Sequence, residues 1–197
     1  MEKVNLSQCW PDILYFGPVW GQDGGNCTEI FIKGGTRLVD RRRTKGVLAA
    51  LARVFARDLV CLRDNIRREA NRSHSLPLML DPKMVLVPVK ARTAYIKDEG
   101  TTGYLVLNKL MRVEPLEKEG SGSRLIFQDG LEVTTLLSAA TVRQRVLEAR
   151  SLSQPGWSEA RVAEPPAERV YYVVRVAETS RGKLGLWRGS CGRRPGC

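Results

Sequence analysis

Residues 40–80 read DRRRTKGVLAALARVFARDLVCLRDNIRREANRSHSLPLML, and the rest of the chain is interpreted from this stretch. Its apolar residues recur at intervals of three and four, which is the pattern of a helix with one buried face; they are Val47, Leu48, Leu51, Val54, Phe55, Leu59, Leu62 and Ile66. Asp58 is a good helix N-cap, so the stretch predicts two consecutive helices or one helix kinked near Arg57. Leu51 and Phe55 are expected to be core anchors.

The same stretch is strongly basic. Between residues 41 and 72, ten basic residues stand against three acidic ones, which leaves a net charge of +7. Surface helices usually place an acidic residue one turn from a basic one, and a one-sided excess repels itself unless an anion is nearby. The plainer alternative is a solvated helix face, since long cationic side chains favour helix surfaces.

We therefore rank a nucleic acid first as the partner. The predicted contact residues are Arg41, Arg42, Arg43, Lys45, Arg53, Arg57, Arg63, Arg67, Arg68 and Arg72. Arg41, Arg42 and Arg43 have no acidic neighbour beyond Asp40, so we expect them to bind the ligand and to contribute little to stability.

Composition bounds the class of protein. The chain has 197 residues and a net charge of +11, which indicates an anionic partner and says nothing about fold. An 18-residue apolar run is absent and the start lacks a signal-peptide pattern, so we predict a cytoplasmic protein without a membrane span. Five cysteines without CxxC spacing favour neither a disulfide framework nor a zinc site. Cys61, inside the helical pattern, is expected to be a small core residue.

The other patterns predict an α+β fold, in which antiparallel hairpins pack against the basic helical segment and a second, short helix. Hairpins are expected at 28–40 around Gly34-Gly35, at 77–89 around Asp81-Pro82-Lys83, and at 124–136 with Asp129-Gly130 at the tip. Residues 103–115 predict one further strand.

Ser138 is expected to cap the short helix over 139–152. Four apolar residues of this helix are available to face the sheet, namely Val142, Val146, Leu147 and Leu152. Its arginines give a second basic surface, formed by Arg143, Arg145 and Arg150.

The domain is expected to span 28–152. Residues 1–27 are aromatic and glycine-rich and suggest a loosely packed N-terminal arm. Its aromatic side chains could stack on bases, but docking against the core of the domain is the preferred interpretation. Residues 153–179 resemble a Pro- and Glu-rich linker that can hold one extra strand, and 180–197 resemble a basic, glycine-rich, disordered tail.

Signatures of catalysis are missing from the sequence. The only histidine, His74, stands between two serines at a predicted helix end, where a cationic side chain is simply favourable. GxxxxGK[ST], strand-linked GxGxxG and HExxH motifs do not occur. We expect no enzymatic activity, no cofactor and no metal.

A set of short motifs gives the chain a family resemblance. Val39-Asp40-Arg41 precedes the basic segment, and Ser73-His74-x-x-Pro77-Leu78-Met79-Leu80-Asp81-Pro82 and then Val85-Leu86-Val87-Pro88 follow it. Later come Leu125-Ile126-Phe127-x-Asp129-Gly130, then Ser138 and Gln144. In this order and spacing, over roughly 28–152, the motifs resemble those of the competence transcription factor (ComK) family. Gly103-Tyr104 departs from that family's Cys-x-Trp.

The resemblance implies a cytoplasmic, nucleoid-associated transcription activator of competence genes. Such a protein binds paired A/T-rich boxes in double-stranded DNA, largely through the minor groove and as a homo-oligomer, with RNA polymerase as a further partner. Arginine suits the narrow, strongly negative groove of A-tracts. Two alternatives stay open, an RNA- or ribosome-associated basic protein and a non-catalytic scaffold that binds an acidic protein.

Overall fold

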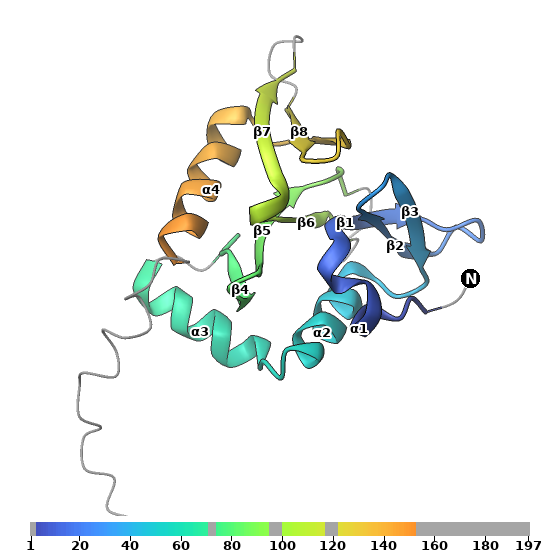
Figure 1. Ribbon diagram of the computed structural model, residues 1–197, viewed down its shortest axis with the longest axis horizontal. Helices are drawn as coiled ribbons and strands as arrows, with labels where there is room; N and C mark the ends of the chain where they lie inside the picture. The colour runs from blue at the N-terminus through green and yellow to red at the C-terminus, as the bar shows by residue number, and fades with distance from the viewer. Residues whose placement is uncertain (1–2, 71–73, 95–99, 117–121, 153–197) are drawn as a thin grey trace, which may run out of the picture.

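The computed structural model describes residues 3–70, 74–94, 100–116 and 122–152, which form two antiparallel sheets and a set of helices (Figure 1). The large sheet has six strands in the order β3-β2-β1-β6-β5-β4; they are β1 (Ile13–Trp20), β2 (Asn26–Ile32), β3 (Thr36–Asp40), β4 (Leu78–Asp81), β5 (Met84–Lys90) and β6 (Thr102–Val106). The small sheet has the order β7-β8-β9, with β7 (Leu110–Pro115), β8 (Ser123–Phe127) and β9 (Glu132–Thr135). The predicted α+β class is confirmed.

Two cores lie on the two faces of the large sheet. Helices α1 (Leu6–Cys9), α2 (Thr44–Val54) and α3 (Leu59–Ala70) cover one face, where Leu48, Leu51 and Leu86 are buried. The small sheet and α4 (Ala139–Leu152) cover the other, against residues such as Val87. Because β5 is covered on both faces, six of its seven residues are buried, as its continuous apolar sequence predicts.

The three predicted hairpins are present. Gly34 and Gly35 join β2 to β3 with φ of +86° and +75°, a conformation that glycine adopts without strain. Gly130, with φ of +84°, lies in the turn between β8 and β9. The turn at Pro82 and Lys83 joins β4 to β5.

The basic segment is two helices that break where the sequence predicts. The amide N–H of Arg57 donates to the carbonyl of Ala52 (2.8 Å) and that of Ala56 to the carbonyl of Arg53 (3.1 Å), the paired bonds of a Schellman end. Ala56 takes the left-handed conformation that this motif requires, with φ of +50°. Asp58 then accepts hydrogen bonds from the backbone N–H groups of Val60 (2.7 Å) and Cys61 (3.0 Å) and so caps α3.

The prediction of a loose N-terminal arm is wrong. β1 lies between β2 and β6 in the middle of the large sheet, and the residues from Ile13 to Pro18 are buried. Gly21, Gly24 and Gly25, which suggested an arm, instead lie in the connection from β1 to β2. The apolar run of 13–16 is followed by Gly17-Pro18, a pair that usually marks a turn, so the sequence does not indicate a continuous strand here.

Three smaller predictions also fail. Residues 103–115 form two strands, not one, because the 3-10 helix η2 (Leu107–Lys109) carries the chain from the large sheet to the small one. Cys61 is exposed, because it lies on the outer side of α3. On α4, Val142 and Val146 are buried as expected, but Leu147 is 57% exposed.

The predicted linker (153–179), the predicted basic tail (180–197) and Arg72 lie outside the described residues. Within those residues, no helix combines the length and apolar character needed to cross a membrane.

Candidate nucleic-acid interface

The first turn of α2 carries an unusual concentration of positive charge. Arg43 is the N-cap residue, its side chain makes no capping hydrogen bond, and no acidic residue lies in the first turn. Arg41, Arg43 and Lys45 are all exposed. These three residues, called here the basic α2 start, have no carboxylate partner among the described residues.

The helix begins here because its backbone is anchored to β2. The buried hydroxyl of Thr28 donates to the carbonyl of Arg42 (2.7 Å) and lies 3.5 Å from the hydroxyl of Thr44, which is also buried. Val47, Leu48 and Leu51 then pack into the core. Hydrogen bonds to Thr28 and the packing of α2 therefore fix the position of the basic α2 start. Its charged groups take no part in this anchoring.

This charge arrangement is unfavourable for the helix alone. A helix N-terminus carries a partial positive charge, so anions stabilise it and cations destabilise it. At α3 the chain follows that rule with Asp58, whereas α2 begins among three cations. Exposed helix N–H groups together with cations form a binding site for an anion such as phosphate.

Arg42 makes contacts within the fold that the sequence did not indicate. Its guanidinium forms an ion pair with the buried carboxylate of Asp40 (Nε–Oδ1 2.9 Å) and donates to the carbonyl of Val4 (2.9 Å). Burial alone would raise the pKa of Asp40, but hydrogen bonds from the Arg42 side chain and backbone and from the Val4 N–H hold this pKa below its ordinary value. Arg42 therefore stabilises the fold, and the expectation that 41–43 contribute little to stability is wrong for this residue.

Some of the other predicted contact residues are exposed, and others form hydrogen bonds or ion pairs within the protein. Arg53 is exposed on the outer side of α2, whereas Arg57 donates from Nε to the Leu80 carbonyl (3.1 Å). On α3, Arg67 pairs with Asp64 (3.1 Å) and Arg68 donates to Asn65 Oδ1 (2.6 Å). Arg63 is half-buried beside Tyr104; burial raises the pKa of that tyrosine, and Arg63 partly opposes the rise.

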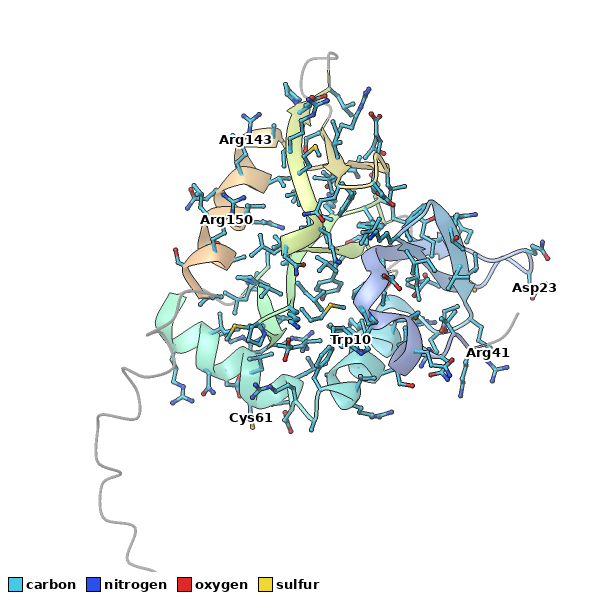
Figure 2. The ribbon with its side chains drawn as sticks, in the orientation of Figure 1. Trp10, Asp23, Arg41, Cys61, Arg143 and Arg150 are labelled. Atoms are coloured by element: carbon cyan, nitrogen blue, oxygen red, sulfur yellow. The ribbon has the colours of Figure 1, made fainter. Side chains whose placement is uncertain are left out.

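The predicted second basic surface on α4 is partly used for structure. Arg145 donates to the carbonyl of Pro88 (2.7 Å), which lies in the part of β5 that is not paired with β4. Arg143 donates to the carbonyl of Val113 (2.8 Å). Figure 2 shows Arg143 and Arg150 projecting outward from α4, on the opposite side of the molecule from Arg41. The exposed arginines thus lie on separate faces.

Sequence reasoning missed an arginine that binds an aromatic ring. The guanidinium of Arg92 lies 4.3 Å from the ring centroid of Trp20, and its Nη2 donates to Asn26 Oδ1 (2.9 Å). This cation–π pair joins the end of β1 to the segment after β5. Those residues are far apart in sequence, and neither lies in a motif.

Comparison with known proteins gives no assignment. No family model matches the chain, and no curated protein matches it either. Among the described residues, histidine, cysteine and acidic side chains do not gather in groups of three or more that could hold a metal ion.

Proposed function

We propose that the protein is a DNA-binding transcription regulator that holds duplex DNA at the basic α2 start. The observation that supports this is the set of unpaired cations at a helix N-terminus, on backbone anchored by Thr28. Such an arrangement reduces the stability of α2 unless a polyanion offsets it, so binding is the function that accounts for it. Arg53 is a further exposed cation, in the last turn of α2.

The finer features of the proposal come from the motif resemblance to the competence factors. They are an A/T-rich target, contact through the minor groove, activation of competence genes, and the partners of that family, a further copy of the chain and RNA polymerase. Arg41 and Arg43 suit the groove contact, because guanidinium groups enter the narrow, negative minor groove of A-tracts.

Fluorescence anisotropy with the full chain tests the proposal. The probes are an A/T-rich duplex, a G/C-rich duplex of equal length and a structured RNA. In the variant Arg41→Ala/Arg43→Ala/Lys45→Ala we expect duplex affinity at moderate salt to fall by about 100-fold or more, since each lost phosphate contact removes a salt-dependent share of affinity. The matched control, Lys33→Ala/Lys83→Ala/Lys90→Ala, removes the same charge from exposed residues away from α2 and should bind almost as the wild type does.

Equal weakening in both triple variants would show that net charge, not this site, drives binding. Preference for the structured RNA over both duplexes would replace the proposal by the RNA-associated alternative. Failure to bind any of the three nucleic acids would favour the scaffold for an acidic protein.

A further inference from the structure

A pocket of about 180 Å3 lies between α3 and the large sheet. Its lining includes Arg63, Arg67, Leu78, Pro88, Thr102 and Tyr104. Pro88 and Tyr104 are directly paired across β5 and β6, so the sheet forms one wall and α3 the other. A single water needs only about 10–15 Å3 of such space, so the pocket has room for a larger group.

The pocket is positively charged. Arg63 and Arg67 are one helical turn apart and both line it, and none of the described residues in the lining is acidic. Arg67 uses one nitrogen to bind Asp64 (Nη1–Oδ1 3.1 Å), and in the described part of the chain no carboxylate pairs with Arg63. Like charges four residues apart on a helix repel each other, so an anion between them would stabilise α3.

The lining also indicates which anion fits. Guanidinium groups present several N–H donors in a fixed plane that matches phosphate oxygens, and Thr102 and Tyr104 add hydroxyl groups. Leu78, Pro88 and the Tyr104 ring offer apolar contact to an organic group attached to the phosphate. We propose that this pocket binds the phosphate group of a phosphate ester.

The ester has two possible sources, a free small molecule or the backbone of a bound nucleic acid. The pocket does not depend on duplex binding at the basic α2 start, because it is formed by other residues. The proposal therefore stands or fails separately from the proposed function.

Calorimetric titration of the full chain at fixed ionic strength tests the pocket, with inorganic phosphate, adenosine 5′-monophosphate and adenosine as probes. We expect saturable one-to-one binding of phosphate and of the monophosphate, and none of adenosine. Arg63→Gln and Arg67→Gln should each weaken binding about 10-fold or more, since each removes charged hydrogen bonds. Arg68→Gln is the matched control, because Arg68 lies on the same helix but outside the lining.

Absence of saturable phosphate binding in the wild type, or equal weakening in Arg68→Gln, would overturn the proposal. Amide NMR on the wild type gives a second test, which does not depend on whether the variants fold. Amide NMR shifts on adding the monophosphate should be concentrated at Arg63, Thr102 and Tyr104, and shifts concentrated at the basic α2 start would contradict the pocket.

A competition experiment then identifies the source. If saturating monophosphate weakens duplex binding in the wild type but not in Arg63→Gln, a backbone phosphate occupies the pocket. If duplex affinity does not change, the pocket takes a free ester. Both results support a phosphate site. If no duplex binds the protein, the calorimetric titrations still test whether the pocket binds phosphate.

Discussion

The carboxylate of Asp40 joins the end of β3, the start of the basic segment and the N-terminal residues. Its side chain is fully buried and accepts hydrogen bonds from the backbone N–H groups of Val4 (2.9 Å) and Arg42 (2.7 Å). Removing one member of a buried ion pair typically costs about 3–5 kcal/mol. Because the Arg42 side chain is 22% exposed, we expect Asp40→Ala to lower the free energy of unfolding by about 3 kcal/mol, measured by urea denaturation. A loss below about 1 kcal/mol would mean that the hydrogen bonds and ion pair of Asp40 contribute little to stability.

The same carboxylate should make stability depend on pH. Hydrogen bonds from Arg42 and Val4 outweigh burial and hold the pKa of Asp40 below its ordinary value. This stabilisation is therefore fully present above the unfolded pKa of about 3.9 and is lost as the pH falls through the lower folded pKa. In urea denaturation, the difference in stability between wild type and Asp40→Asn should be constant from pH 7 to about pH 5 and should shrink below about pH 4. A difference that persists at low pH would show that the charge of Asp40 is not its source.

A second residue-level constraint is the buried ring of Tyr15. A Cβ atom added at Gly103 would overlap the Tyr15 hydroxyl, and the same is true at Gly17. We expect Gly103→Ala to lower the free energy of unfolding by about 1–3 kcal/mol, as overpacking does. In a Tyr15→Phe background, part of that loss should be recovered. Gly25→Ala is the control, since a Cβ there meets nothing within 4 Å; a similar loss at Gly25 would contradict the packing explanation.

The turn between α2 and α3 can be tested as an element. Ala56 holds the left-handed position of the Schellman end, which is usually glycine, at a cost of about 1 kcal/mol. Ala56→Gly should therefore raise the free energy of unfolding by up to about 1 kcal/mol, while Ala49→Gly in the interior of α2 should lower it by a similar amount. Thermal or urea unfolding measures both changes. Destabilisation by Ala56→Gly would mean that flexibility at this junction outweighs relief of strain.

Elements with a local signal could be predicted from the sequence, and elements defined by distant contacts could not. Glycine pairs and Asp-Gly fix the hairpin turns, and Asp58 marks the start of α3, so these predictions are confirmed. β1 was missed because Gly17-Pro18, a pair that usually marks a turn, interrupts its apolar run after Phe16. The end of α2 has no glycine to mark it, so the sequence located the break through Asp58 alone.

At the scale of the whole molecule, the sequence gives the total charge but not its distribution. The basic residues of 41–72 appear continuous in sequence, yet Arg42 and Arg57 bind protein groups, whereas Arg41, Arg43 and Lys45 remain exposed. Whether an arginine reaches an acceptor within the protein depends on where β3 and β4 lie in the fold, which no local sequence pattern predicts. The pocket arginines were included in the predicted set, but their meeting with Thr102 and Tyr104 requires the folded sheet.

The separation of the exposed arginines predicts how salt dependence responds to mutation. A duplex too short to bend around the protein, held at the basic α2 start, should not reach α4, because Arg150 and Arg41 lie on opposite sides of the molecule (Figure 2). Plots of log affinity against log salt should therefore lose about 2–3 units of slope in Arg41→Ala/Arg43→Ala/Lys45→Ala, at about 0.9 per phosphate contact. The slope should be unchanged in Arg143→Ala/Arg150→Ala. Comparable losses per removed charge in both variants would mean that the basic α2 start does not by itself hold the duplex, which would contradict the proposed site.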